Sequence, residues 1–481
     1  MIKRKLLILS LFLLSISLFS SCSSSENVTD DNDNDIEIKE DEEKEVIDYT
    51  NAIFASPLGN GTGSMDDPCS LLDGINRLTD TNNALYLYGG TYNFTSSISL
   101  GKNGNPESFY KISAFEDEKV TLDFGMDYRK NPPKNGNYNS GITKGIMIKG
   151  TYYHLYGLKV TNCGAHGIHI FGSHNKVENC ILAYNGNTGL NISSPSANPK
   201  ETWAHDNLVL NCTSYGNYDW DRLDGEEGED ADGFGCKMTS GINNVFDGCI
   251  SYNNSDDGWD LFTKHQTGKI GSVTIRNCVA FNNGYSYDGK ELKNGNGFKL
   301  GGRVLEVDHF VTNSIAFNNK ANGFDDNSNP GTITLKDCTA YNNGAKNYAM
   351  GRFTDEINTY NSTWDENGTT YGPIENVPKS HNVFENCASY LGGSSDTFVG
   401  YATNCYFYRN NSFHSFTSKQ VCNSKYNLGT IYNAHDIFKS RTIDLSDFEN
   451  IHYIFRNKDK SVNLKGFLDL EDSYSFGAKL S

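Results

Sequence analysis

A short unit that recurs through the middle of the chain constrains the fold more than any other feature. The stretch Cys-Ile-Leu-Ala-Tyr-Asn-Gly at 180–186 has partial copies at 249–254, 278–284, 314–319 and 338–344. A second motif alternates with it, a glycine between a polar and a large apolar residue, at Gly167, Gly189, Gly233, Gly258, Gly297 and Gly323. These glycines are 22, 44, 25, 39 and 26 residues apart, which indicates a period of 22–26 residues with occasional loop insertions.

Such a unit predicts a stacked all-β architecture. Its strands are short, rich in β-branched and aromatic residues and closed by Asn or Gly, so one unit alone cannot bury a face. Units stacked along one axis can bury their apolar faces against one another, which is the principle of a solenoid. An Asn after each Tyr or Phe suits a left-handed turn, and stacked Asn amides can hydrogen-bond along the axis, at Asn253, Asn282, Asn318 and Asn342. We predict a parallel β-helix rather than a propeller, whose blades need longer repeats.

The cysteines fit the same stack. Six of the 12 stand in one context, at Cys180, Cys212, Cys249, Cys278, Cys338 and Cys387. The sequence has no Cys-x-x-Cys pair, which argues against a zinc ribbon. Because buried Cys behaves as a small hydrophobe, we interpret these six as inward-facing residues of successive coils. Among the others, Cys405 and Cys422 are the pair that we expect to form a disulfide.

The N-terminus predicts export. Lys3-Arg4-Lys5 precedes the apolar run 6–19, as in a signal peptide, and the residues before Cys22 resemble a bacterial lipobox. We expect residues 1–21 to be a lipoprotein signal peptide and Cys22 to be lipidated; the alternative is ordinary cleavage with an incidental cysteine. The expected location is the outer membrane or cell surface of a Gram-negative-type bacterium.

The remaining chain divides by composition. Residues 22–50 are rich in acids and too polar to fold, so we predict a disordered tether. Residues 51–425 form the predicted β-helix domain, which begins with an N-terminal cap, and 426–481 lose the repeat and are expected to be an irregular C-terminal cap. The formal charge of −18 argues against nucleic acid as a partner. We expect a monomer that contacts the membrane only through its lipid anchor.

The repeat brings acidic residues together on neighbouring coils. Equivalent positions of a parallel β-helix stack about 4.8 Å apart, so residues at a fixed offset from each glycine form a column. Asp232 and Asp257 precede their glycines, Asp260 and Lys299 lie two residues after theirs, and Asp256 adjoins Asp257. Four carboxylates in such proximity repel one another unless a cation neutralises them, and their oxygens suit Ca²⁺. Isolated Asp-Gly pairs are often only turns, but their register here favours a calcium site made by all four aspartates.

Two cations next to this cluster are candidate functional residues. Lys299 stands in Asn-Gly-Phe-Lys-Leu-Gly-Gly, where small neighbours leave it accessible. A bound dication would lower the pKa of Lys299, whereas Asp260 and Asp325 would raise it, and a salt bridge to Asp325 is the alternative role. Arg303 is a candidate for binding a substrate carboxylate, or else a solvated loop charge. Four histidines are interpreted as turn or face residues rather than zinc ligands, namely His166, His169, His174 and His205.

These segments resemble the family 9 polysaccharide lyases, the pectate-lyase family built on a right-handed parallel β-helix. The resemblance runs from about residue 51 to 350 and is most specific at 229–234, 254–262 and 294–302. It implies that Lys299 is the Brønsted base and that the calcium ligands are Asp232, Asp256, Asp257 and Asp260. This chain has Cys236-Lys237 where the family often has Ala before the Lys, and we predict no functional consequence of that difference.

The resemblance implies a calcium-dependent lyase that cleaves galacturonate linkages of pectin, an acidic plant cell-wall polysaccharide, by β-elimination. The same mechanism on the rhamnogalacturonan I backbone stays open. A calcium-stabilised surface β-helix that binds glycans without catalysis is a further alternative. A β-helical hydrolase would need an acid and a carboxylate with water between them, which fits acids clustered beside a lysine less well.

Overall fold

The computed structural model describes residues 48–130, 144–219, 227–292 and 294–480. The chain divides into two units, Met1–Asp48 and Tyr49–Ser481. The expected signal peptide, Cys22 and the tether up to residue 47 lie outside the described residues. Within the described part, no helix is long and apolar enough to cross a membrane.

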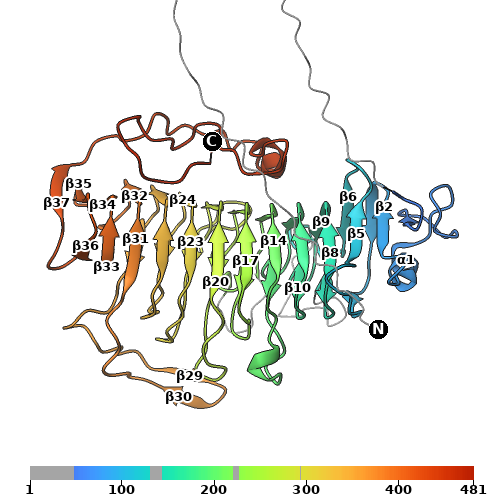
Figure 1. Ribbon diagram of the computed structural model, residues 1–481, viewed down its shortest axis with the longest axis horizontal. Coiled ribbons are helices and arrows are strands. Elements are labelled where there is room, and N and C mark those ends of the chain that lie inside the picture. Colours follow the sequence, from blue (N-terminus) through green and yellow to red (C-terminus); the bar gives the residue numbers. More distant parts are fainter. Residues whose placement is uncertain (1–47, 131–143, 220–226, 293, 481) are drawn as a thin grey trace, which may run out of the picture. The chain divides into compact units, whose positions relative to one another are not determined.

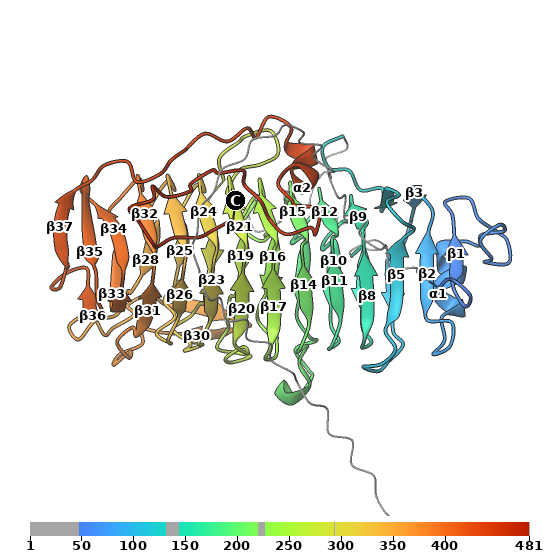
Figure 2. The same cartoon turned by 45° about the horizontal axis from the view of Figure 1, so that its top comes forward.

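The second unit is a right-handed parallel β-helix, which confirms the predicted all-β fold (Figures 1 and 2). Most coils add one strand to each of three sheets. The site sheet contains β4 (Ile98–Leu100), β7 (Ile146–Ile148), β10 (Ile168–Ile170), β13 (Leu190–Ile192), β16 (Phe234–Cys236), β19 (Trp259–Asp260), β22 (Phe298–Lys299), β25 (Phe324–Asp325) and β28 (Tyr348–Met350).

The flank sheet joins the site sheet through β33 and contains β1 (Ile53–Ala55), β2 (Ala84–Leu87), β5 (Tyr110–Ala114), β8 (Tyr153–Tyr156), β11 (Lys176–Glu178), β14 (Leu208–Leu210), β17 (Asn244–Asp247), β20 (Val273–Arg276), β23 (Phe310–Thr312), β26 (Thr334–Lys336), β31 (Asn382–Glu385), β33 (Thr397–Thr403) and β36 (Gln420–Asn423). The strap sheet contains β3 (Gly90–Asn93), β6 (Val120–Asp123), β9 (Leu158–Thr161), β12 (Ile181–Ala183), β15 (Thr213–Tyr215), β18 (Ile250–Tyr252), β21 (Val279–Phe281), β24 (Ile315–Phe317), β27 (Thr339–Tyr341), β32 (Ala388–Tyr390), β34 (Cys405–Arg409), β35 (Ser412–Phe416) and β37 (Thr430–Asn433).

A short helix lies at the first coils, where the sequence predicts an N-terminal cap. Helix α1 (Leu71–Arg77) begins after Ser70, whose hydroxyl accepts a hydrogen bond from the Asp73 amide at 3.2 Å. The helix buries Leu71 and Ile75 beside β1 and β2. It therefore shields the open end of the solenoid core from water.

Two long connections leave the turn between the site sheet and the flank sheet, on the same side of the solenoid (Figure 1). Residues 193–207 carry the 3₁₀ turn η1 (Lys200–Thr202). Residues 351–381 carry an antiparallel hairpin of β29 (Trp364–Glu366) and β30 (Thr369–Tyr371). The connection 193–207 accounts for part of the 44-residue spacing between Gly189 and Gly233, whereas residues 351–381 lie beyond the last of the repeated glycines.

Like residues stack on like inside the coils. Rings of the site sheet form an inward ladder with centroids 4.8–5.2 Å apart, made of Phe234, Trp259, Phe298, Phe324 and Tyr348. The six predicted inward cysteines are all buried, which confirms their interpretation. The expected Cys405–Cys422 disulfide is absent, since both are free thiols. Cys405 begins β34 and continues the cysteine column, whereas Cys422 lies on β36 of another sheet.

The asparagines form two adjacent columns rather than one. The predicted left-handed turn residues are confirmed, with φ of 51–53° at Asn253, Asn282, Asn318 and Asn342. The main amide ladder, however, is one residue further along, where each Nδ2 donates to the next Oδ1 at 2.8–3.0 Å, through Asn185, Asn217, Asn254, Asn283, Asn319, Asn343 and Asn347. The left-handed residue turns the chain so that the following amide points inward.

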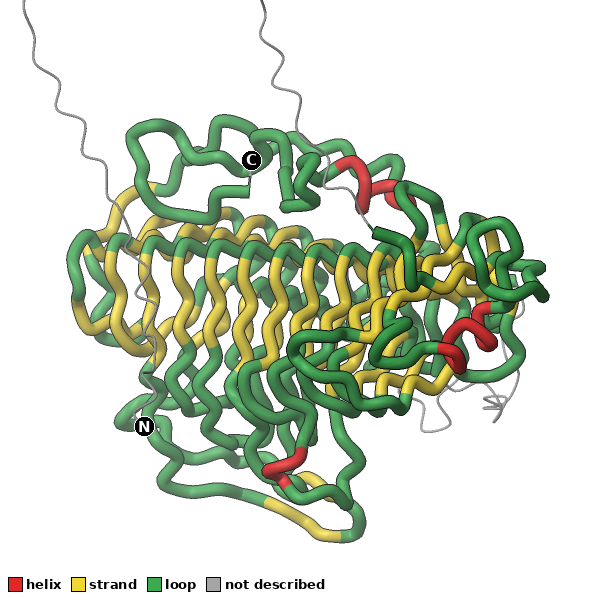
Figure 3. The backbone as a smooth tube through the Cα atoms, turned by 45° about the vertical axis from the view of Figure 1, so that its right-hand side comes forward, coloured by secondary structure: helices red, strands yellow, loops and turns green. Residues whose placement is uncertain are grey.

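The C-terminal segment only partly caps the end of the solenoid. Strands β35 to β37 add to the last coils as antiparallel strands. Residues 434–480, here called the strap, then run back along the strap sheet and include η2 (Phe448–Asn450) and α2 (Ile451–Ile454) (Figures 2 and 3). The strap covers a row of stacked outward rings at Tyr215, Tyr252, Phe281 and Phe317, which water would otherwise contact. This burial explains the departure from a simple end cap.

Candidate active site

Strand alternation places the candidate residues on the outer face of the site sheet. Phe234, Trp259, Phe298 and Phe324 point inward, and the next residue of each strand points outward. Those outward residues are in register on successive coils, pairing Gly235 with Asp260, Asp260 with Lys299, and Lys299 with Asp325. The column predicted from the repeat is confirmed.

The turns before these strands hold two of the aspartates. The Asp232 carboxylate accepts from Thr188 Oγ1 at 3.1 Å, and Asp257 Oδ1 accepts from the backbone and side-chain amides of Asn296 at 2.7 and 2.8 Å. Gly258 follows Asp257, and a Cβ there would lie 2.5 Å from the Gly297 carbonyl oxygen. Glycine is therefore required for coils to stack this closely, which explains the Asp-Gly pairing.

The structure gathers the four predicted aspartates into one buried cluster. One carboxylate oxygen from each of Asp232, Asp257 and Asp260 lies within 4.8 Å of the others. Asp256 lies outside this tightest group, but it is fully buried and interacts electrostatically with the other three. Burial, followed by the charge of Asp257, raises the pKa of Asp256 well above its usual range, and burial raises that of Asp232 to about 7.

Lys299 reaches into this cluster from the next coil. Its Nζ lies 3.0 Å from Asp257 Oδ2 and 3.6 Å from Asp260 Oδ1. Burial disfavours the ammonium form, but the surrounding carboxylates outweigh burial and raise the pKa of Lys299 well above its usual range. The alternative salt bridge to Asp325 does not occur among the described residues; Asp325 instead accepts hydrogen bonds from Asn322 and Asn327.

Sequence reasoning missed Lys237, a second lysine in the cluster. Its Nζ lies 2.6 Å from Asp232 Oδ2 and 2.9 Å from Asp260 Oδ2, and its side chain is only 8% exposed. Burial opposes the charge of Lys237, yet Asp232 and Asp260 hold its pKa above the usual range. The ammonium bridges two coils. The one signal in the sequence was the lysine of Cys236-Lys237, which the resemblance to the family includes.

The cluster fits a hard divalent cation. Four carboxylates and two ammonium groups leave two formal negative charges in a buried space. Both oxygens of Asp256 are buried without a hydrogen-bond partner among the described residues. Unpaired carboxylate oxygens are costly to bury, and a cation such as Ca²⁺ would satisfy them.

Arg303 lies beside Lys299 but is partly engaged. Its guanidinium carbon is 5.4 Å from the Phe262 ring centroid, and Lys299 Nζ is 5.6 Å from the same ring. Its other side faces the β29–β30 hairpin, with Cζ 4.9 Å from the Trp364 ring and Nε 3.7 Å from Glu366 Oε1. Two cations thus flank one ring at the outer surface.

A cationic cavity continues the outer face beyond Lys299. It has a volume of about 440 Å³ and is lined by Asp325 and Asp326 together with Lys346, Arg352 and Lys425. Arg352 Nη1 donates to Ser328 Oγ at 2.9 Å, and its guanidinium packs on the Tyr360 ring. These three basic side chains would attract an anionic polymer lying along the coils.

Comparison with known proteins places this site in a family. A family model described as "Pel9A-like, right handed beta helix region" matches residues 53–367. A protein named Pectate lyase L from Paenibacillus polymyxa (strain SC2) is 41% identical over 325 residues, covering 66% of this chain and 69% of that protein. The crystal structure of pectate lyase Pel9A has a TM-score of 0.63 at 27% identity and covers 89% of this chain and 92% of its own. A rhamnogalacturonan lyase has a TM-score of 0.61 at 21% identity, covering 88% and 97%, and shares the fold.

The β-helix, its outward aspartates and lysine, and these relatives define a polysaccharide lyase. Within that class, the chain belongs to the Pel9A-like right-handed β-helix family.

Proposed function

We propose that the chain is a calcium-dependent lyase that cleaves the galacturonate linkages of pectate by β-elimination, with Lys299 as the base. The observation that carries this proposal is the position of Lys299 Nζ beside Asp257 and Asp260, on the outer face of neighbouring coils. The names of the relatives support pectate as substrate. The basic residues along the outer face support a polyuronate.

Asp232, Asp256, Asp257 and Asp260 are the residues that would hold the calcium ion. When bound, Ca²⁺ supplies Lewis-acid stabilisation of charge on the substrate carboxylate and neutralises the aspartates. The raised pKa of Lys299 comes from those same aspartates. Once their charge is balanced, burial remains as the main influence on Lys299 and favours its neutral amine.

The neutral amine of Lys299 would act as general base. The C5–H bond of the galacturonate breaks, and its proton goes to Nζ. The electron pair forms the C4–C5 double bond as the C4–O4 bond breaks, and O4 takes a proton from water. Arg303, beside the same Phe262 ring, would orient a uronate carboxylate by charge-assisted hydrogen bonds.

The test is ultraviolet absorbance of the unsaturated product, with and without chelator. Polygalacturonate should give calcium-dependent absorbance with the natural chain, and Lys299→Ala should lose at least 10³-fold in turnover while retaining calcium binding. Lys336→Ala, at an exposed lysine of β26, is the matched control and should keep full activity.

Other outcomes would redirect the proposal. Absorbance only with the rhamnogalacturonan I backbone would indicate that substrate. Reducing ends without absorbance would indicate hydrolysis, and binding without either product would indicate a glycan-binding β-helix. Undiminished activity of Lys299→Ala would remove Lys299 from the mechanism.

We also propose that the enzyme is exported and anchored through a lipid on Cys22, followed by the acidic tether. The lipobox-like residues before Cys22 support this. Cys22→Ala should move the enzyme from the membrane fraction to the soluble fraction, and an unchanged distribution would contradict the anchor.

A further inference from the structure

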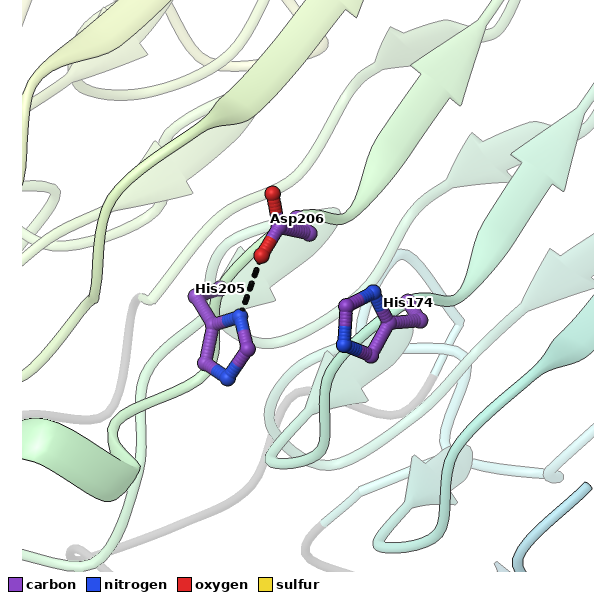
Figure 4. A group of neighbouring side chains, drawn as sticks. All are labelled: His174, His205 and Asp206. Carbon is purple, nitrogen blue, oxygen red and sulfur yellow. Dashed lines mark hydrogen bonds and ion pairs between the residues drawn. The ribbon is translucent and has the colours of Figure 1, made fainter. Parts of the chain in front are cut away.

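We propose that His174, His205 and Asp206 form a second metal site, suited to a transition-metal dication such as Zn²⁺, which fastens the connection 193–207 to the preceding coil. One ligand atom from each of these residues lies within 4.8 Å of the others (Figure 4). The group lies on the turn between site sheet and flank sheet, apart from the aspartate cluster.

Coil stacking creates this group from residues that are far apart in sequence. Strands β11 and β14 pair Lys176 with Leu208, so His174 and Asp206 occupy equivalent positions of adjacent coils. Both have left-handed backbones, with φ of 60° and 54°, as turn residues of the solenoid do. The His174 amide donates to the His205 carbonyl at 3.1 Å, which fixes the two turns against each other.

The side chains are held in place before any metal binds. The Tyr152 ring stacks on His174 at 4.8 Å with an interplanar angle of 7°. Asn243 Nδ2 donates to Asp206 Oδ1 at 2.9 Å, and Asp206 Oδ2 lies 2.5 Å from His205 Nδ1. Figure 4 shows the His174 and His205 rings on neighbouring turns, side by side. Such outer contacts orient imidazole and carboxylate ligands in known metal sites.

The ligand chemistry selects a different ion from the aspartate cluster. Two imidazoles and one carboxylate suit Zn²⁺, Cu²⁺ or Ni²⁺, whereas a set made only of carboxylates suits Ca²⁺. All three side chains are half-buried, so an ion can reach them from solvent and retain water as a further ligand.

A metal here would act on the connection 193–207. His205 and Asp206 end this connection, while its first residues contact the outer face, where Ser193 Oγ lies 2.8 Å from His169 Nε2. Between these ends, residues 195–202 are exposed. An ion shared with His174 would therefore tie the C-terminal end of this connection more firmly to the coil before it.

The experiment is calorimetric titration of the full chain with Zn²⁺ while Ca²⁺ saturates the aspartate cluster. One Zn²⁺ should bind, and His174→Asn should weaken binding at least tenfold, because Asn tolerates the left-handed backbone but removes the imidazole. His381→Asn, at an exposed histidine of the same chain, is the control and should bind as the natural chain does. Co²⁺ should give a visible absorption band that the His174→Asn variant lacks.

Two further measurements test the proposal even if one variant fails to fold. Asp206→Asn keeps a residue that tolerates the left-handed turn, and it should also weaken Zn²⁺ binding. Hydrogen exchange in 193–207 should slow on adding Zn²⁺ only in the natural chain. Equal Zn²⁺ affinity of the natural chain and both variants, binding only by displacement of Ca²⁺, or unchanged exchange in 193–207 would overturn the proposal.

Discussion

At the scale of single residues, Lys237 makes the aspartate cluster possible in the absence of metal. Its ammonium lies within 2.9 Å of both Asp232 and Asp260, which stand on different coils. Without it, Asp232 would lose its ion pair and Asp260 would keep only Lys299, whose Nζ lies 3.6 Å away. Lys299 also pairs with two of the aspartates, from the next coil. Under the proposed function, Lys237 would have a structural role and Lys299 a catalytic one.

We expect Lys237→Met to lower the free energy of unfolding by about 3–5 kcal/mol in chelator, since it leaves buried carboxylates unpaired. Calcium should restore more stability to this variant than to the natural chain, because the cluster gains one negative charge. Urea unfolding with and without Ca²⁺ measures both effects. Lys299→Met carries the same charge change and serves as comparison, with activity lost as well. If Lys237→Met lowered the free energy of unfolding equally with and without Ca²⁺, Lys237 would not act as a counter-charge to the aspartates.

The residues of the cluster differ in how well sequence predicts them. Asp232, Asp257, Asp260 and Lys299 are fixed by their distance from a repeated glycine, so their column is predictable. Lys237 lies after its strand, and only its long side chain brings the ammonium back to the cluster. Side-chain reach of this kind leaves no periodic signal.

At the scale of elements, one turn of the flank sheet uses histidine where other coils use asparagine. The amides of Tyr153, Asn175 and Asn207 each donate to an Asn side chain of the next coil. The Val273 amide instead donates to His309 Nδ1 at 3.2 Å. His309 is fully buried, and burial lowers its pKa from 6.5 to about 3.

This substitution predicts a pH-dependent stability. Between pH 6.5 and 3 the unfolded chain protonates His309 and the folded chain does not, so stability falls as pH falls through this window. The natural chain should lose free energy of unfolding between pH 7.5 and pH 5. We expect His309→Asn to make this loss smaller by about 1–2 kcal/mol, measured by urea unfolding at both pH values. His381→Asn, an exposed control, should leave the loss unchanged. An identical loss in His309→Asn would exclude His309 as its source.

Elements inside the repeat are predictable, and those inserted between repeats are not. The left-handed asparagines followed from the motif, but the ladder residue one step later depends on the direction the turn gives the chain. The hairpin β29–β30 and the connection 193–207 lack the repeat. Their sequences therefore do not predict the ion pair of Glu366 with Arg303 or the contact of His205 with His174.

At the scale of the whole molecule, charge is arranged along the outer face for an anionic polymer. The acidic cluster is followed by Lys346, Arg352 and Lys425 around one cavity. We expect Arg352→Ala to raise KM for polygalacturonate about two- to fivefold with little change in kcat, since an exposed charge contributes up to about 1 kcal/mol. Arg276→Ala, at an exposed arginine of β20, should change neither constant. A fall in kcat at constant KM would contradict a binding role.

The strap is hydrogen-bonded to neighbouring coils of the solenoid through Arg456. Its guanidinium donates to the Gly248 carbonyl at 2.8 Å and to the Cys212 carbonyl at 3.1 Å, in the equivalent turns of two adjacent coils. We expect Arg456→Met to lower the free energy of unfolding by about 2–3 kcal/mol, because buried carbonyls lose their donors. Arg441→Ala, an exposed arginine of the strap, should cost less than about 1 kcal/mol in urea unfolding. Equal losses would indicate that Arg456 does not anchor the strap.

The buried free thiols make unfolding in an oxidising medium hard to reverse. In the described part of the chain eleven cysteines are buried and reduced, so oxidants cannot reach them while the coils stay closed. Once the coils open, the same thiols become available to one another in any order, and random cross-links would trap the opened chain. Survival of this enzyme in an oxidising medium is then set by how slowly it opens rather than by its equilibrium stability.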